Sequence, residues 1–316
     1  MDALTGLLDG PRANGAFLLR IVLDPPWSIR VEDGSPLCLA AMVSGGGWIV
    51  TSPGEATRLH AGDVAIIRGS EPYVLADDPM TRPQVLVHPG QRCATPDGRD
   101  LHEQMALGVR TWGSDPNGSM TMLLGVYEQV GAVGQRLLKA LPRVLVVSAG
   151  TWDPTLVALL GREITQDAPG QDVLLDRLLD LLLISVLRVW LDRPGAEGPA
   201  WYGALGDPVV GRALRLLHED PAQPWTVASL AERTGISRAA LARSFTELVG
   251  AAPMTYLREW RLALAADLLR EPTATLDAVA RQVGYGDGFA LSTAFTRVRG
   301  VSPREHRTGG RVPAAR

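Results

Sequence analysis

The fold is decided by two stretches of the C-terminal third, TVASLAERTGISRAALARSFTELVGAAPMTY at residues 226–256 and TLDAVARQVGYGDGFALSTAFTRVRGVSPREH at residues 275–306. They repeat one pattern at an offset of 49 to 50 residues. Small, apolar and glycine positions all recur, and the matching pairs are Ala231 with Ala280, Gly235 with Gly284, Leu241 with Leu291, Phe245 with Phe295, Gly250 with Gly300, and Pro253 with Pro303. The repeat indicates a duplicated structural unit.

Each copy predicts a helix-turn-helix. Thr226 and Thr275 stand where a side chain can cap the first helix of each copy. Gly235 follows that helix in the first copy and can adopt the left-handed backbone that ends a helix, where a side chain costs about 1 kcal/mol or more. Ser237 is placed to cap the second helix.

The spacing of apolar residues divides the second helix into two faces. Leu241, Phe245 and Leu248 share one face, which we expect to be buried. On the opposite face Arg243 is predicted to reach a guanine edge and Arg238 a phosphate, while small residues allow close approach to a major groove. The predicted DNA-contacting residues are Arg238, Ala239, Ala242, Arg243 and Thr246 in the first copy, and Phe289, Ser292, Thr293, Thr296 and Arg297 in the second.

This region resembles the DNA-binding domain of AraC/XylS-type transcription regulators over residues 209–306, through PWTVASLAERTGISRAALARSFTELVGAAPMTYLREWRLALAADLL and AVARQVGYGDGFALSTAFTRVRGVSPREHR. The resemblance implies two helix-turn-helix units that enter successive major grooves of double-stranded DNA, joined by a long helix at about 254–270. It also implies RNA polymerase as a partner. We assign residues 209–310 to this domain.

The second unit departs from the family pattern. Phe289 and Thr293 replace polar residues that the family uses to read bases, and the approach to the helix is rich in glycine, at Gly284, Gly286 and Gly288. The first unit is therefore expected to dominate sequence specificity.

Charge is distributed unevenly along the chain. Residues 207–316 hold fifteen arginines, no lysine and eleven acidic residues, a net charge of +4, whereas residues 1–206 carry a net charge of −7. The basic third is the part suited to a polyanion, although four excess charges are a weak signal without the repeat.

The N-terminal part of the sequence has the pattern of a β-rich domain followed by two helices. Short apolar runs about ten residues apart, separated by Gly and Pro, predict a β-barrel or β-sandwich, and Gly45–Gly47 reads as a hairpin turn. Two helices are predicted at 154–168 and 171–193, followed by a Pro- and Gly-rich linker at 193–208. The second helix is apolar around most of its circumference, so we expect Leu178, Leu182 and Val189 to lie on or near a homodimer interface.

Residues 1–192 also resemble, more loosely, the cupin-type sensor barrel that precedes this DNA-binding domain in one branch of the family, through PPWSIR (25–30), LHAGDVAIIRG (59–69) and LADDP (75–79). The resemblance places Ala40 and Tyr73 where metal-binding histidines are often found, so we expect no metal and no cofactor. It implies a barrel that senses a small organic effector, for which Trp27, Met42, Trp48 and Tyr73 are candidate contacts.

The fold class expected is thus α+β multidomain, a cupin-like β-barrel with flanking dimerisation helices and an all-α domain with two helix-turn-helix units. Two cysteines, no signal-peptide pattern and no uninterrupted apolar span predict a cytoplasmic protein without membrane contact. No catalytic arrangement is visible. Two alternatives stay open, a cupin metalloenzyme fused to a DNA-binding domain and a ligand-independent dimeric regulator.

Overall fold

The computed structural model describes residues 16–52, 54–193 and 200–309, which form two compact units. One unit is rich in strands and comprises residues 16–130 and 141–193. The other is helical and comprises residues 131–140 and 200–309. The expectation of a β-rich domain followed by a helical domain is confirmed.

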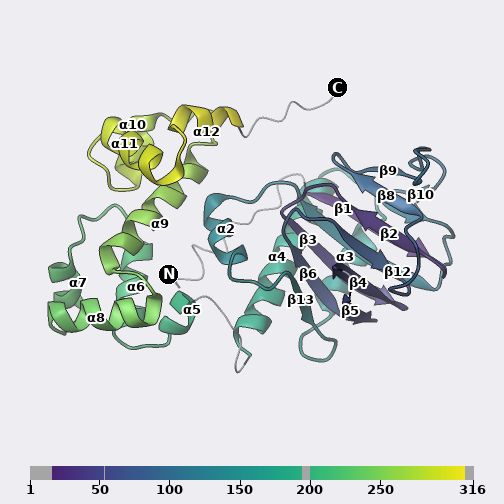
Figure 1. Cartoon of the computed structure of the whole chain (residues 1–316), viewed down its shortest axis with the longest axis horizontal. Coiled ribbons are helices and arrows are strands. Elements are labelled where there is room, and N and C mark those ends of the chain that lie inside the picture. The colour runs from purple at the N-terminus through teal and green to yellow at the C-terminus, as the bar shows by residue number, and fades with distance from the viewer. Residues whose placement is uncertain (1–15, 53, 194–199, 310–316) are drawn as a thin grey trace. The chain divides into compact units, whose positions relative to one another are not determined.

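Two sheets make up the first unit (Figure 1). The seven-stranded sheet has the order β10 (Ala106–Gly108), β11 (Thr111–Gly113), β1 (Phe17–Leu23), β12 (Met120–Tyr127), β3 (Leu37–Ser44), β6 (Val64–Arg68) and β13 (Val144–Val147). The six-stranded sheet has the order β5 (Glu55–His60), β4 (Gly46–Ser52), β7 (Tyr73–Ala76), β2 (Ser28–Val31), β8 (Val85–His88) and β9 (Arg92–Ala94).

Strand β12 shows how the unit is layered. Met122 and Leu124 belong to a hydrophobic core to which both sheets contribute, whereas the alternate residues Leu123 and Gly125 face the other side of the sheet. A side chain at position 125 would collide with Leu179, so the glycine allows a helix to lie against the strand.

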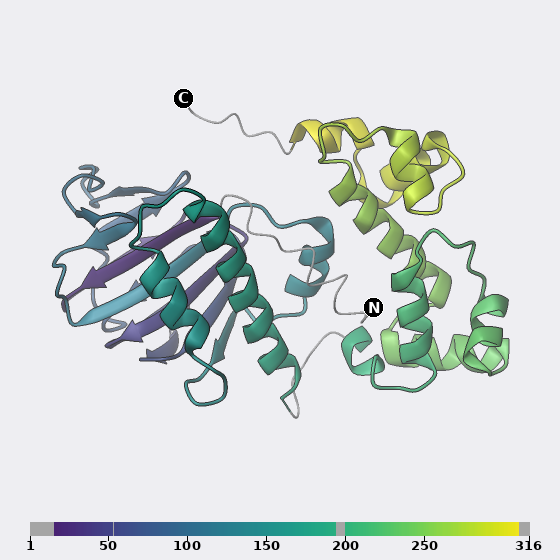
Figure 2. The ribbon, with the colours of Figure 1, turned by 180° about the vertical axis from the view of Figure 1, so that it is seen from behind.

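Helices α3 (Thr155–Glu163) and α4 (Gln171–Leu191) cover that outer face of the seven-stranded sheet, as Figure 2 shows. Helix α4 matches the helix predicted at 171–193, whereas α3 ends five residues before the predicted end at 168. Strand β12 is consequently buried on both faces, which explains why its whole sequence is apolar apart from Thr121 and Tyr127.

The prediction of a hairpin at Gly45–Gly47 is wrong. Strand β3 pairs with β12 and β6, while β4 pairs with β5 and β7 in the other sheet. The chain crosses between sheets at Gly45, where φ is 74° and a Cβ would lie 3.0 Å from the Met120 Cα atom. Glycine punctuation predicted the turn, but pairing depends on strands that are distant in sequence.

The helical unit contains two groups of helices on either side of α9, a long helix (Figure 1). Its elements are α2 (Ala132–Leu138), α5 (Ala200–Ala204), α6 (Val210–Glu219), α7 (Val227–Thr234), α8 (Arg238–Val249), α9 (Pro253–Leu268), α10 (Leu276–Gln282), α11 (Gly288–Arg299) and α12 (Pro303–Gly309). The joining helix predicted at about 254–270 is α9.

Helix α2 packs within this unit although its sequence lies between β12 and β13. The carboxylate of Asp267 on α9 accepts hydrogen bonds from the backbone N–H groups of Ala132 (2.5 Å) and Val133 (3.0 Å). A Cβ at Gly131 would lie 2.9 Å from that carboxylate, so a side chain there would have to displace it from these hydrogen bonds. The Arg136 guanidinium is 3.6 Å from the Glu259 carboxylate.

The stretch expected to be a linker, 193–208, lies partly outside the described residues, at 194–199. Within its described part the chain forms α5, where Trp201 and Ala204 are buried. Burial of an aromatic side chain favours a packed helix over an extended connection at that point.

Candidate nucleic-acid interface and effector cavity

The first helix-turn-helix consists of α7 and α8. Thr226 Oγ1 accepts from the Ser229 N–H at 3.0 Å and Ser229 Oγ accepts from the Thr226 N–H at 3.0 Å, which closes a reciprocal cap at the start of α7. Gly235 ends α7 with φ 78°, in the left-handed region, and Ser237 Oγ accepts from the Ala240 N–H at 3.2 Å to start α8. The turn between the helices has the geometry that the sequence predicts.

Helix α8 separates a buried face from an exposed one. Leu241 and Phe245 are fully buried, as expected, but Leu248 is 39% exposed, so its predicted burial is wrong. Leu248 lies in the last turn before Gly250, where neighbouring helices cover α8 less completely. Of the predicted DNA-contacting residues on this helix, Arg238, Ala239, Arg243 and Thr246 are exposed and Ala242 is half-buried.

The second helix-turn-helix consists of α10 and α11. Thr275 caps α10 through the Ala278 N–H (3.2 Å), and Asp287 caps α11 through the Ala290 N–H (2.7 Å). The buried positions Leu291 and Phe295 match Leu241 and Phe245 of the first unit. On the opposite face Phe289, Thr293, Thr296 and Arg297 are exposed and Ser292 is half-buried.

Arg261 on α9 connects the two helix-turn-helix units. Its guanidinium donates to the carbonyl oxygens of Pro221 (2.6 Å) and Gln223 (2.7 Å), just before the first unit, and of Gly284 (3.1 Å), in the turn of the second. Gly284 has φ 83°, and a Cβ there would lie 2.7 Å from the Ala222 carbonyl oxygen. These contacts fix both units to one helix. Nothing in the local sequence pattern identified Arg261.

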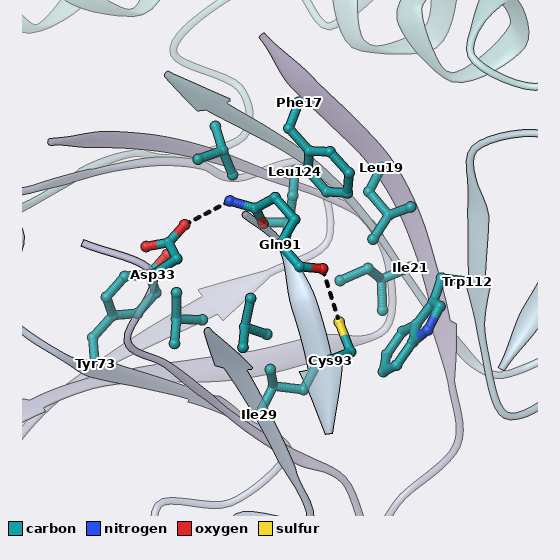
Figure 3. A pocket seen from close by; sticks show the side chains of 13 residues that line it. Phe17, Leu19, Ile21, Ile29, Asp33, Tyr73, Gln91, Cys93, Trp112 and Leu124 are labelled. Carbon is teal, nitrogen blue, oxygen red and sulfur yellow. Dashed lines mark hydrogen bonds between the residues drawn. The ribbon is translucent and has the colours of Figure 1, made fainter. Parts of the chain in front are cut away.

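The strand-rich unit contains a mainly apolar cavity between its two sheets (Figure 3). Its lining residues are Phe17, Leu19, Ile21, Ile29, Val31, Asp33, Tyr73, Val87, Gln91, Cys93, Trp112, Leu124 and Val126. The internal space is about 30 Å³, which is room for only a few water molecules. Any organic molecule must therefore move part of this lining in order to bind.

Polar groups meet at one side of the cavity, where Asp33 Oδ2 accepts from Gln91 Nε2 at 2.8 Å (Figure 3). Gln91 lies in the turn between β8 and β9 with φ 58°, and its carbonyl oxygen is 3.8 Å from Cys93 Sγ. Burial raises the pKa of Tyr73 well above its ordinary value, so the phenol is protonated at neutral pH and can donate a hydrogen bond.

Of the candidate effector contacts, Tyr73 lines this cavity, whereas Trp27, Met42 and Trp48 do not. Trp27 and Met42 are buried in the core, with Trp27 packed near Gly47, and Trp48 is half-buried with the Arg58 guanidinium 5.0 Å from its ring. Asp33, Gln91 and Trp112 were not anticipated, because they come from turns and strands far apart in sequence.

The predicted interface residues on α4 have different environments. Leu178 and Leu182 are buried within their own chain, at 5% and 1% exposure, and Val189 is half-buried. Because both leucines are already buried in the single chain, they cannot form an exposed surface. The apolar residues that α4 does expose are Val173, Leu174 and Leu181.

Among the described residues no group of three or more His, Cys, Asp or Glu side chains is arranged to hold a metal ion. In the same part of the chain, no helix combines the length and the apolar character that a membrane span requires.

Comparisons with known proteins agree with this architecture. A family profile described as "Cupin" matches residues 2–192, and one described as "Helix-turn-helix domain" matches residues 230–309. An AraC-like transcription regulator from Streptomyces lividans is 32% identical over 99% of this chain and 100% of its own. The HTH-type transcriptional regulator AlkR from Acinetobacter baylyi is 27% identical over 97% and 99% of the two chains.

A solved AraC-type DNA-binding regulator from Chromobacterium violaceum is 26% identical, with a TM-score of 0.32, and covers 35% of this chain and 99% of its own. The full-length relatives are transcription regulators, not enzymes. The chain belongs to the AraC family of DNA-binding transcription regulators and carries an N-terminal cupin domain.

Proposed function

We propose that this regulator binds DNA through α8 and α11 in successive major grooves and that a small apolar or aromatic molecule in the cupin cavity controls it. The two earlier alternatives, a metalloenzyme and a ligand-independent regulator, become outcomes of the tests below. Domain boundaries of 1–192 and 209–310 remain part of the proposal, as does RNA polymerase as a partner.

The exposed face of α8 supports its role as the main reader of sequence. Arg243 and Arg238 are exposed, and within the described residues no hydrogen bond or ion pair engages their guanidinium groups. A free guanidinium can form two hydrogen bonds to a guanine edge or bind a phosphate. Ala239 and Ala242 next to them allow the helix backbone to approach the groove closely.

The cavity is the observation that supports an organic effector. Its lining is apolar apart from Asp33, Tyr73, Gln91 and Cys93, which suits a molecule held by burial with one polar group directed toward Tyr73 or Asp33. Because the free space is small, binding is expected to break the Asp33–Gln91 hydrogen bond and displace the turn between β8 and β9. Strand β9 lies at the edge of its sheet, where it pairs with β8 and forms one further bridge, between Ala94 and Asp100, so its displacement disrupts few backbone hydrogen bonds.

The test is a screen of small aromatic and aliphatic compounds by thermal shift, followed by operator binding with and without each hit. Tyr73→Phe should weaken the binding of a compound that forms a hydrogen bond with the phenol. Trp112→Phe should remove the part of any ligand-induced fluorescence change that arises in the cavity. A hit whose effect is equal in wild type and in both variants would place its site elsewhere. Stoichiometric transition metal in protein purified without chelator would revive the metalloenzyme.

We also propose that the exposed side of α4 is the self-association surface. Leu174 and Leu181 lie seven residues apart, two turns along one face of the helix, and both remain exposed in the single chain. Burying them against a second copy would remove apolar area from water. Sedimentation of the purified chain tests whether a homodimer forms.

A further inference from the structure

Phe289 on α11 presents an aromatic ring to solvent. It is 82% exposed, whereas Phe245 and Phe295 are fully buried. A single exposed apolar side chain is common on protein surfaces, so its position and its neighbours must carry the argument.

Its position is the second residue of the second recognition helix. Asp287 caps α11 and Phe289 follows two residues later, as Ala239 follows the capping Ser237 on α8. The N-terminal turn of a recognition helix is the part that contacts base edges in the major groove. Phe289 therefore occupies a base-reading position at which the first unit has only a methyl group.

The neighbouring positions also lack the charged side chains that the first unit has there. Gly288 and Thr293 stand where the first unit has Arg238 and Arg243. The Thr293 hydroxyl donates to the Phe289 carbonyl oxygen at 3.0 Å, which leaves its methyl group as the outward part of the side chain. Because residues 289 and 293 are four apart, the ring and this methyl share one helix face.

The start of α11 is also acidic. The Asp277 carboxylate accepts from the Gly288 N–H at 2.8 Å, and Asp287 accepts from the Ala290 N–H at 2.7 Å. Two carboxylates at this point disfavour phosphates and the acceptor atoms of guanine. The surface thus has no free cation in its first turn and offers apolar contact instead.

We propose that Phe289, together with the methyl group of Thr293, contacts thymine C5-methyl groups in the half-site bound by α11. The thymine methyl is the apolar feature of the major groove, and a phenyl ring is among the groups that read it. This inference rests on the proposed placement of α8 and α11, and it adds the chemistry of the bases recognised by the second unit.

The experiment uses the full-length chain and the duplex that it selects from a random library. Each thymine of the α11 half-site is replaced by deoxyuridine, which removes only the methyl group. Operator affinity should fall about fourfold for each contacted thymine. Phe289→Ala should reduce the difference between the thymine and uracil duplexes to the part that the Thr293 methyl group contributes, and Phe289→Leu should retain more of that difference.

Deoxyuridine in the half-site bound by α8 is the matched DNA control, and Phe289→Ala should leave its effect unchanged. Because the ring is exposed, circular dichroism and thermal unfolding of the variants should match wild type. The inference is overturned if Phe289→Ala keeps the wild-type ratio between thymine and uracil duplexes. It is also overturned if that variant binds the operator normally but loses transcriptional activity, because the ring would then contact a protein.

A chain that selects no sequence at all would overturn the proposed function and this inference with it. Selection of a sequence without any deoxyuridine effect would overturn the inference alone.

Discussion

Replacing Arg243 by alanine tests the assignment of base readout to the first unit. The side chain is exposed on α8, and within the described residues no intramolecular hydrogen bond or ion pair holds its guanidinium. Its removal should change the free energy of unfolding by less than about 0.5 kcal/mol, as for other surface substitutions. The substitution should instead reduce the free energy of DNA binding.

A bidentate contact to guanine contributes about 1 to 3 kcal/mol of discrimination, so operator affinity should fall roughly 5- to 150-fold. Affinity for random DNA should change little, because a base contact adds nothing to non-specific binding. Fluorescence anisotropy at several salt concentrations measures both affinities and the salt dependence of each. The slope of log K against log salt should stay near its wild-type value for Arg243→Ala.

Arg238→Ala is the matched control, since Arg238 starts the same helix and is assigned to a phosphate. It should weaken operator and random DNA by similar factors and reduce the magnitude of the salt slope by about 0.9. Equal loss on both DNAs for Arg243→Ala, with a reduced slope, would make Arg243 a phosphate contact and refute the assignment.

Three further outcomes are expected. Leu181→Glu should weaken the dimer in sedimentation experiments without unfolding the chain, because Leu181 is 49% exposed. Leu182 is 1% exposed, so Leu182→Ala should instead destabilise the cupin domain by about 2 to 5 kcal/mol. A dimer unaffected by Leu181→Glu would contradict the α4 interface. Burial raises the pKa of Cys93 to about 11 and of Cys38 to about 12, so both thiols should react slowly with a disulfide reagent at pH 8 unless the protein is denatured. The buried thiols stay protonated in the folded protein while the unfolded thiols ionise near pH 8.5, so the free energy of unfolding should fall as the pH rises above that value. Rapid labelling of the native protein would show that the cavity lining opens. Asp267→Ala should speed hydrogen exchange at the amides that its carboxylate binds at the start of α2, whereas unchanged exchange there would indicate that α2 does not depend on this contact.

The helical domain was the more predictable part because its signals are local. Each turn is marked by a glycine at a left-handed position, each second helix by a capping side chain, and the core by leucine and phenylalanine four residues apart. Leu248 shows the limit of this reasoning, since periodicity assigns a residue to a face but does not show how far along the helix the neighbouring helices extend.

The cupin domain was less predictable because its site is assembled from distant segments. Phe17, Asp33, Gln91 and Trp112 meet only after parallel and antiparallel pairing of strands from both sheets, and no spacing in the sequence brings them together. The environment of the residues on helix α4 was also hard to predict. It is apolar on nearly all sides, so the pattern could not show which leucines face the sheet and which remain exposed.

The carbonyl contacts of Arg261 have a consequence for the length of the DNA site. One guanidinium holds both the segment just before the first helix-turn-helix unit and the turn of the second, so the protein limits how far the separation of α8 and α11 can adjust to the DNA. Two major-groove segments on one face of the duplex are about 10.5 base pairs apart, and one inserted base pair rotates the second segment by roughly 34°. Natural operators of this regulator should therefore keep a constant spacing between their two half-sites even where the bases of that spacer vary.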